Sequence, residues 1–423
     1  MVSQPFSRAA GLVTAGYTHW LTLWRTDRRT LLHEQMLAVI GAGFLLSPEP
    51  VWSDFYYVLV LPVALSLAWR GRAQVNLRHM SPVLLCGSVL VLWMTTTVLW
   101  DARALAQPGR MTLWLWNAFC TFIYIHALSD ALGADATFRP RVARVMALAG
   151  LANIVISFII LGLNPARSWA DDVLRLNGWA ETRHPIMGAI VIGIVVLMAL
   201  DRGLRVGGWY YWLTAIAGLV FIGLTGSRGP EGAICVAITV LLGLTQPRLL
   251  AVLVLGALLA LGLFACLDWP FLHHLLIGHV ARGDSHRLAI WARSWHDIRQ
   301  SPWFGHGPGY LLAGPHEESF PHNLLLSTWL YGGIIALGLL GLYIVLVTRR
   351  AIGTANPADR ALNIALLVQV GLSAMTDFSQ VIRGPSLMWY IFWLPTLFAA
   401  ASPQCRSAAR AEGGTRHGIR DRA

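Results

Sequence analysis

Lysine is absent from this sequence, and all 32 basic residues among its 423 are arginine. Charge as a whole is scarce, because only 13% of the residues are charged, against about 25% in soluble domains. Cysteine is scarce too, with five residues that lie mostly in apolar runs and show no C-x-x-C spacing. The low charge argues against a soluble protein of this length. The cysteine pattern argues against a disulfide framework or a thiolate metal site.

Long apolar runs fill the rest of the chain. Hydrophobic residues make up 56% of it and the mean hydropathy is +0.57, and runs of roughly 17–25 apolar residues recur, the length that crosses a bilayer as a helix. We therefore predict an all-α, polytopic membrane protein with about 12 transmembrane helices. The predicted spans are 31–47, 54–69, 82–100, 112–129, 142–163, 185–201, 208–225, 230–245, 248–267, 322–348, 360–376 and 385–401.

Arginine asymmetry predicts how these spans are oriented. With both termini in the cytoplasm, 21 of the 32 arginines fall inside and 11 outside, which satisfies the positive-inside rule. For a bacterial inner membrane the outer face is the periplasm. Four predicted features then face the periplasm: the loop 164–184, the hairpin at Arg228, the segment 268–321 and the loop at Arg383.

This topology divides the chain into five predicted parts. They are a cytoplasmic segment (1–30), nine transmembrane helices (31–267), a periplasmic loop with an interfacial helix (268–321), three further transmembrane helices (322–401) and a basic cytoplasmic tail (402–423). The net charge of +11 is spread over these loops rather than gathered on one face, so we expect no nucleic-acid partner. The sequence makes no prediction of the oligomeric state.

The segment 268–321 is the only sizeable predicted piece outside the membrane. Its residues Leu288, Trp291, Trp295 and Ile298 recur at helical spacing and form one apolar stripe. The stripe predicts an amphipathic helix that lies in the membrane interface. The Gly/Pro-rich run 301–309 then predicts a tight turn.

Arg228 stands between two predicted spans, in the hairpin Thr225-Gly226-Ser227-Arg228-Gly229-Pro230. A guanidinium in hydrocarbon costs on the order of 3 kcal/mol on insertion scales, so it is expected there only with a partner or a function. Its place beside a helix N-terminus favours an anion bound by both. The alternative is a structural arginine that pairs with Glu231 or reaches the water.

Arg287 and His322 repeat this geometry on the same predicted face. Arg287 lies in the first turn of the interfacial helix, and His322 follows Pro321 at the start of the tenth span. Two arginines can bind phosphate oxygens bidentately, which suits a pyrophosphate-linked lipid. A histidine near two arginines is expected to be neutral, so it can accept a proton from an attacking hydroxyl. The alternatives are an ordinary interfacial arginine and a histidine that caps a backbone group.

Further candidates lie on the same predicted face. Two of them precede Pro185 at the start of the sixth span and are placed to contact phosphate or glycan. A carboxylate upstream of His322 could orient its imidazole or act as the base itself, although charged loop residues are usually solvated surface. These secondary candidates are Arg183, His184, His286, His316, Glu317 and Glu318.

Nucleotide and metal motifs are missing. The sequence has no GxxxxGK[ST], HExxH or DxD motif and no spaced carboxylate set for Mg²⁺. We therefore expect no cofactor and no metal, with phosphate bound by arginines alone. Because nucleotide sugars are cytoplasmic, a site on the outer face also points to a lipid-linked donor.

Four motifs together resemble the O-antigen ligase/polymerase superfamily and favour its O-antigen ligase family. Thr225-Gly226-Ser227-Arg228-Gly229 resembles the SRG hairpin of that superfamily, and Arg183-His184-Pro185 resembles its HP element. The run from His286-Arg287 to Trp291, with Ile298-Arg299-Gln300-Ser301-Pro302 and Phe304-Gly305-His306-Gly307-Pro308-Gly309, is similar to its R…W…P-x-x-G-x-G-x-G signature. Pro321-His322-Asn323 resembles its HN motif. The resemblance covers roughly residues 183–345.

The resemblance implies a GT-C-like membrane glycosyltransferase. Such an enzyme moves a preassembled glycan from undecaprenyl pyrophosphate to an acceptor in the periplasm, without a metal and with inversion at the anomeric carbon. It implies that Arg228 and Arg287 hold the pyrophosphate and that His322 activates the acceptor hydroxyl. Pro308 and the Glu317-Glu318 pair depart from the family pattern.

The members of this superfamily differ in their acceptor. One main periplasmic segment and a short basic tail favour an O-antigen ligase of lipopolysaccharide biosynthesis. Its acceptor is a sugar hydroxyl of lipid A–core, and membrane lipids surround the enzyme. The alternatives are an O-antigen polymerase, which uses another lipid-linked repeat, and an O-oligosaccharyltransferase, which uses a protein hydroxyl. A lipid-linked glycan transporter is the alternative from another class, but the candidate anion-binding residues cluster on one face.

Overall fold

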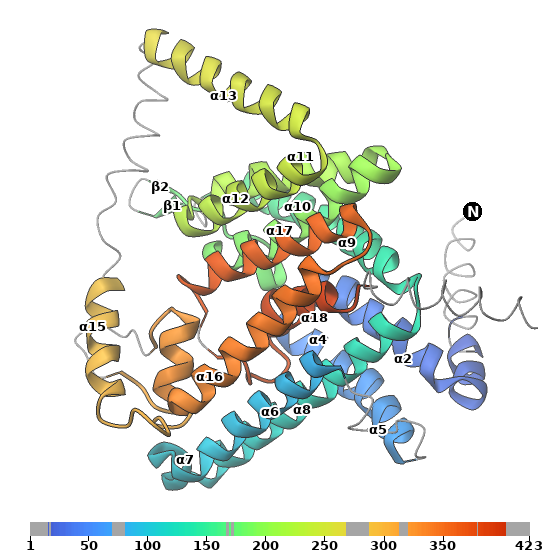
Figure 1. Ribbon diagram of the computed structural model, residues 1–423. Coiled ribbons are helices and arrows are strands. Elements are labelled where there is room, and N and C mark those ends of the chain that lie inside the picture. The colour runs from blue at the N-terminus through green and yellow to red at the C-terminus, as the bar shows by residue number, and fades with distance from the viewer. Residues whose placement is uncertain are drawn as a thin grey trace, which may run out of the picture.

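The computed structural model describes residues 16, 18–69, 81–165, 169–170, 173–267, 287–312, 320–378 and 380–402. These residues form a bundle of helices (Figure 1). The elements up to residue 163 are α2 (Arg28–Ala38), η1 (Val39–Gly43), α3 (Phe44–Leu46), α4 (Glu49–Phe55), η2 (Tyr56–Val60), α5 (Leu61–Trp69), α6 (Pro82–Thr96), η3 (Thr97–Trp100), α7 (Ala102–Ala106), α8 (Pro108–Ala134) and α9 (Phe138–Leu163).

The later elements include the longest helix, α16, and α10, the most buried of the candidate membrane spans. They are β1 (Trp169–Ala170), β2 (Val173–Leu174), η5 (Ala180–Thr182), α10 (Pro185–Val206), α11 (Trp209–Thr225), α12 (Arg228–Thr245), α13 (Pro247–Leu267), α15 (Arg287–Ile298), α16 (Leu324–Ile352), α17 (Pro357–Ala374), η6 (Trp389–Trp393) and α18 (Leu394–Ala400). The short elements η1, η2 and η6 are π-helical turns, and η3 and η5 are 3₁₀ turns.

The helical fold is confirmed and is consistent with a polytopic membrane protein, while the number of spans stays a prediction. Every predicted span falls on helix, and seven helices of the described part are long and apolar enough to cross a membrane. Three more apolar helices, 209–225, 247–260 and 389–400, are shorter. The exception to an all-α fold is a two-residue antiparallel ladder in which Trp169 of β1 lies opposite Leu174 of β2.

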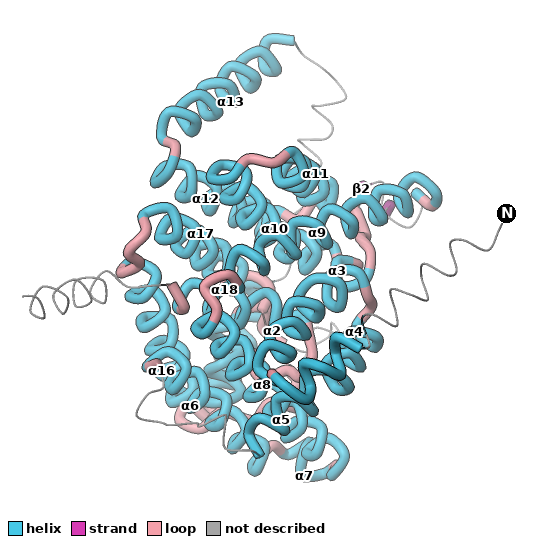
Figure 2. The backbone as a smooth tube through the Cα atoms, turned by 90° about the vertical axis from the view of Figure 1, so that its right-hand side faces the viewer, coloured by secondary structure: helices cyan, strands magenta, loops and turns pink. Residues whose placement is uncertain are grey.

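Helix α10 forms the centre of the bundle. Of its apolar window 78% is buried, and α9, α11, α12 and α17 pack around it (Figures 1 and 2). A helix that is apolar all round is expected in such a position. Helix α13 is the opposite case, since it stands away from the other helices in both views.

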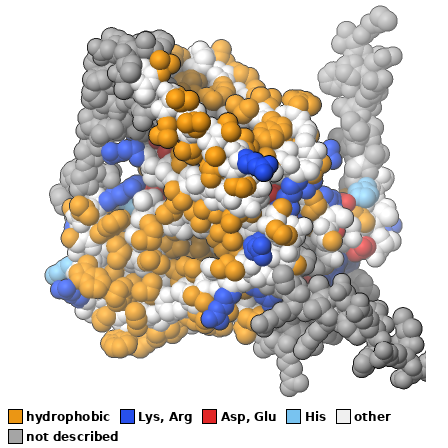
Figure 3. Space-filling model, turned by 45° about the horizontal axis from the view of Figure 1, so that its top comes forward, with side chains coloured by type: hydrophobic (Ala, Val, Ile, Leu, Met, Phe, Trp, Pro, Cys, Tyr) orange, Lys and Arg blue, Asp and Glu red, His pale blue; other side chains and the backbone are white. Residues whose placement is uncertain are grey.

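The outer surface is strongly apolar. Apolar side chains cover most of the face drawn in Figure 3, with arginine side chains standing separately among them. A surface of this kind suits lipid contact rather than water. Cysteines in apolar runs are expected to be small buried side chains. This is confirmed for Cys86 and Cys120, which are buried, but is wrong for Cys235, which is exposed.

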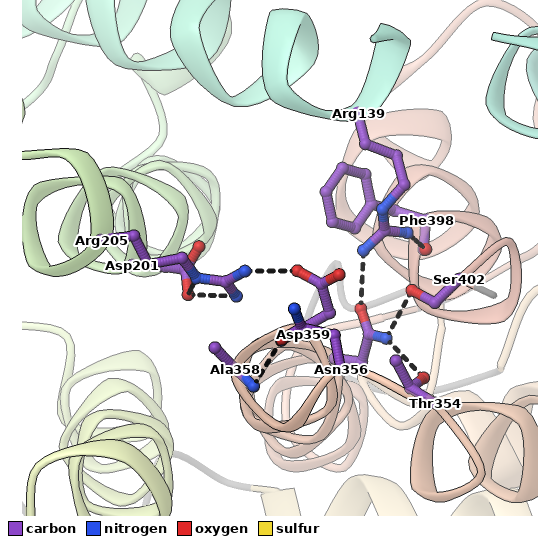
Figure 4. Close-up of polar contacts among 10 residues, drawn as sticks. Arg139, Asp201, Arg205, Thr354, Asn356, Ala358, Asp359, Phe398 and Ser402 are labelled. Carbon is purple, nitrogen blue, oxygen red and sulfur yellow. Dashed lines mark hydrogen bonds and ion pairs between the residues drawn. The ribbon is translucent and has the colours of Figure 1, made fainter. Parts of the chain in front are cut away.

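Two polar networks join the helix ends at one end of the bundle (Figure 4). Arg139 at the start of α9 bonds to Asn363 of α17 over 3.1 Å, and Asn363 donates to Ser402 after α18 over 2.8 Å. Arg205 of α10 pairs with Asp201 over 2.7 Å and also with Asp359 of α17. Loops predicted to be cytoplasmic therefore lie together, and the loops predicted to be periplasmic begin or end the same helices at the other end.

The predicted interfacial helix is present as α15, but its apolar stripe is divided between two faces. Ile290, Ser294 and Ile298 are buried against the protein, whereas Leu288 and Trp295 are exposed. The Trp295 ring still contacts Trp329 of α16, with 5.2 Å between ring centroids. The stripe prediction missed the buried face because Ser294, a small polar residue, lies at its centre.

Candidate active site

A buried amide in α9 fixes the loop that precedes α10. Asn153 Nδ2 donates to the backbone oxygens of Leu45 (2.7 Å) and Trp179 (3.1 Å), and its Oδ1 accepts from Thr182 Oγ1 (2.9 Å). The Asn153 side chain is fully buried, so these bonds satisfy polar atoms that have left water. The loop is thereby held in place where α10 begins.

This loop lines a cavity of about 600 Å³ together with the start of α4 and the segment 383–391. The cavity has both basic and acidic walls. Its charged and polar lining residues are Glu49, Asn177, Glu181, Arg183, His184, Asp377, Arg383 and Ser386. Arg183 and His184, two of the secondary candidates, thus share one space with residues that lie 200 positions further along the chain.

Asp377 connects Arg287 to this cavity. Arg287 Nη2 donates to Asp377 Oδ1 over 2.8 Å, and Thr376 Oγ1 donates to Asp377 Oδ2 over 2.7 Å. The Asp377 side chain is 1% exposed and that of Arg287 is 26% exposed. Burial raises the pKa of Asp377, against the Thr376 hydroxyl and the Arg287 guanidinium, which lower it. The pair is a mostly buried ion pair at the edge of the cavity.

Arg228 begins its helix beside the same aspartate. It is the first residue of α12 and its side chain is exposed. The next residue, Gly229, packs against Thr376 and Asp377: a β-carbon at Gly229 would lie 3.2 Å from Thr376 Oγ1 and 3.7 Å from Asp377 Oδ2. The turn 375–377 therefore contacts the Arg228 hairpin on one side and Arg287 on another.

His322 is held in a left-handed backbone conformation, with φ at 52°. Its ring packs on Phe320, with 4.1 Å between ring centroids, and Phe320 lines the cavity. Ala180 is the other described non-glycine residue with positive φ, and like Phe320 it lines the cavity. Such conformations cost of order 1–3 kcal/mol and gather at functional sites.

Asn323, and not His322, caps helix α16. Its Oδ1 accepts from the backbone nitrogens of Leu325 (3.0 Å) and Leu326 (3.1 Å), while its Nδ2 donates to the Met375 carbonyl over 3.1 Å. On the other side, Trp291 Nε1 of α15 donates to the Pro321 carbonyl over 3.1 Å. His322 is thus fixed between α15 and the turn 375–377 without serving as the cap.

The glycine turn after α15 docks onto a break in α16. The break is at Gly333, whose φ is 69° and where a β-carbon would lie 2.0 Å from the Trp303 carbonyl oxygen. The turn donates to carbonyls exposed near the break, from His306 N to Leu330 O (2.8 Å) and from Gly307 N to Tyr331 O (3.0 Å). These contacts give the glycine-rich motif a structural role: it holds α15 against α16.

Residues 213–341 match the family model described as O-antigen ligase. This segment of the chain is similar to that family. The matched segment contains Arg228, Arg287 and His322 and, among the residues that line the cavity, Phe320. The other lining residues lie before residue 213 or after residue 341. A search of curated proteins found no match for the chain. Enzymes of this ligase/polymerase superfamily are glycosyltransferase-like and act on lipid-linked glycans.

The described part of the chain does not include every candidate. His286, His316, Glu317 and Glu318 lie outside the described residues. The described residues contain no group of three or more His, Cys, Asp or Glu that could hold a metal ion. The expectation of metal-independent chemistry, like the roles of Arg228, Arg287 and His322, stays a prediction.

The cavity also contains acidic residues that were not predicted as site residues. Asp377 carried a signal in the sequence, because an ionisable residue at the end of a span usually has a partner. Glu181 lies two positions before Arg183, in a loop that was already a candidate. Glu49 lies in a different predicted loop, more than 100 residues away, and no motif marks it.

Glu181 and His184 have shifted protonation equilibria in this cavity. Burial raises the pKa of Glu181 to about 7, and the neighbouring Glu49 adds to the rise, although Trp52 Nε1 donates to its carboxylate over 3.1 Å. Burial and then the nearby Arg175 lower the pKa of His184. Neither group is fixed in its charged form near neutral pH, so the charge of this wall responds to pH and to a ligand.

Proposed function

We propose that this chain is an O-antigen ligase, which transfers a preassembled glycan from undecaprenyl pyrophosphate to a sugar hydroxyl of lipid A–core on the periplasmic face of the inner membrane. One observation carries the proposal. Three motifs far apart in the sequence, around Arg228, Arg287 and His322, meet at the turn 375–377 beside a cavity of about 600 Å³. Two cations and an imidazole beside one cavity are what transfer from a pyrophosphate lipid requires.

The proposed reaction is a single displacement. The acceptor hydroxyl oxygen bonds to the anomeric carbon as the bond from that carbon to the pyrophosphate oxygen breaks, which inverts the configuration. His322 takes the hydroxyl proton. Arg228 and Arg287 stabilise the negative charge that develops on the departing undecaprenyl pyrophosphate.

Asp377 has a defined part in this scheme. When no lipid-linked donor is bound, Asp377 neutralises Arg287 and holds its guanidinium by a hydrogen bond of 2.8 Å. When the pyrophosphate arrives, its oxygens compete with the carboxylate for the same donors. Burial raises the pKa of Asp377, so uptake of a proton costs it less than it would cost an exposed carboxylate.

The experiment that tests the proposal is a reconstitution. The purified chain receives an undecaprenyl-pyrophosphate glycan and lipid A–core, and the products are resolved by gel and mass. We expect glycan-capped lipid A–core, with transfer lowered about 10²–10⁴-fold by His322→Ala and about 10²–10³-fold by Arg228→Gln or Arg287→Gln.

The matched control is Arg299→Gln. Arg299 lies just after α15, is exposed and contacts the ring of Trp295 at 5.3 Å, so its loss should leave transfer within about twofold of the parent. A lengthened lipid-linked glycan with untouched lipid A–core would identify a polymerase instead. A fully active His322→Ala enzyme would remove His322 as the base.

A further inference from the structure

A second cavity, of about 440 Å³, lies at the other end of the bundle. It is lined by Arg141 and Arg144 near the start of α9, Arg202 near the end of α10, and Tyr210 and Tyr211 at the start of α11. Helix α10 begins at the candidate active site and ends at this cavity. At about 1.5 Å per residue, its 22 residues separate the two sites by roughly 30 Å. This cavity therefore belongs to a different site.

The lining of this second cavity is positively charged and lacks an acidic residue. Arg141 lies 3.8 Å from Asp135, a long contact between two partly exposed groups. Neither Arg144 nor Arg202 forms an ion pair with a carboxylate in the part of the chain that the structure describes, and the Nε of Arg202 is buried there without a hydrogen-bond partner. Gathering three guanidinium groups around one cavity with only one long ion pair among them is unfavourable unless an anion joins them.

A neighbouring arginine shows the contrast. Arg205 lies one turn after Arg202 on α10, and it is fully engaged with Asp201 and Asp359 (Figure 4). The protein thus provides carboxylate partners at this end of the bundle where an arginine holds helices together. Among the described residues, Arg144 and Arg202 of the second cavity have no such ion-pair partner, and this distinguishes a binding site from a structural ion pair.

Exposed apolar surface adjoins the cavity. Thr214 Oγ1 of α11 donates to the Ala147 carbonyl of α9 over 3.2 Å, so these helices touch one turn beyond the cavity. The chain neighbours of this contact, Leu148 and Leu213, are both exposed, as is Trp209 at the cavity rim. Trp and Tyr at such a position mark the boundary between headgroups and acyl chains.

We propose that this cavity binds the phosphate headgroup of an anionic phospholipid, whose acyl chains lie along the exposed apolar surface of α9 and α11. Guanidinium groups bind phosphate bidentately, and the tyrosine hydroxyls supply further donors. Basic pockets between transmembrane helices are known to take such headgroups. A lipid is favoured over free phosphate because the apolar surface continues directly from the cavity. The predicted topology puts this lipid in the cytoplasmic leaflet.

The test is the thermal unfolding midpoint of the full chain in detergent, with phosphatidylglycerol, phosphatidylcholine or inorganic phosphate added. We expect phosphatidylglycerol to raise the midpoint by on the order of 5 °C and the other two additions to leave it unchanged. The variant Arg144→Gln/Arg202→Gln should lose this rise. The control Arg248→Gln, an exposed arginine of α13 outside the cavity, should keep it.

Three results would overturn the proposal. An equal rise with phosphatidylcholine would mean general lipid stabilisation, and an equal rise with inorganic phosphate would mean a site for free anions. A rise that persists in the double variant would place the lipid elsewhere. If that variant does not fold, native mass spectrometry of the parent and of Arg144→Gln decides, since equal retention of phosphatidylglycerol by both contradicts the assignment.

Discussion

Arg287 donates to Asp377 over 2.8 Å, and the two residues are 90 positions apart in the chain. The carboxylate belongs to the turn after α17, and the same turn contacts the hairpin of Arg228 and the cap of α16. A buried carboxylate thus occupies the donors that the proposed pyrophosphate would use. The pair makes the turn 375–377 the centre of the candidate site, and it can be tested apart from catalysis.

We expect Asp377→Asn to lower stability by roughly 1–3 kcal/mol, because it leaves the half-buried Arg287 without its counter-charge. A double-mutant cycle with Arg287→Gln isolates the pair. The double variant should be at least as stable as the less stable of the two single variants, as measured by the thermal unfolding midpoint in detergent. Arg287→Gln combined with Asp201→Asn, at a buried aspartate near the far end of α10, serves as the additive control. Additive losses in the first cycle would show that the ion pair contributes nothing.

Substitutions at position 322 should separate strain from chemistry. Because φ is 52° there, His322→Gly should be more stable than His322→Ala by about 1 kcal/mol, and His322→Val should be the least stable of the three. All three variants should lose glycan transfer, since none carries an imidazole. Thermal midpoints and transfer assays on the same preparations give the comparison. Transfer that follows the order of stability would assign His322 a purely structural role.

The helices could be predicted from the sequence because an apolar run in lipid has few solutions other than a helix. Hydropathy does not show where a helix is interrupted, so the π-helical turns η1 and η2 and the break at Gly333 were not foreseen. It also misplaced the packing face of α15, where Ser294 is buried and Leu288 is exposed. Those details depend on the shape of neighbouring helices rather than on average polarity.

The candidate site was predictable to a similar depth. Residues near helix N-termini at one membrane face must lie at a similar depth in the membrane interface. This is why Arg228, Arg287 and His322 could be grouped from the sequence. Their lateral meeting at the turn 375–377 depends on how α12, α15, α16 and α17 pack. No local pattern encodes that packing, so Asp377 was not paired with Arg287 in advance.

The glycine turn can be tested with two glycines of one helix. Gly333→Ala should lower stability by roughly 2–4 kcal/mol, because the new methyl group clashes with the Trp303 carbonyl and the left-handed φ disfavours alanine. Gly338→Ala should change stability by no more than about 1 kcal/mol, because open space surrounds that position. Thermal midpoints of the two variants check this. Equal effects would mean that the turn is not held by the break in α16.

Glu181 should make the stability of the protein depend on pH. Its pKa is raised by burial from 4.5 to about 7, so between these values the folded state binds more protons than the unfolded state. Stability from this group is therefore complete below pH 4.5 and is lost as the pH rises through about 7.

Glu181→Gln keeps a neutral side chain at every pH and should not show this loss. The thermal midpoint of the variant relative to the parent should rise from about pH 5 to about pH 8. Asp54→Asn, at an exposed acid outside the cavity lining, is the control and should show no such trend. A parent and a Glu181→Gln variant with parallel pH profiles would show that Glu181 is ionised in the folded protein.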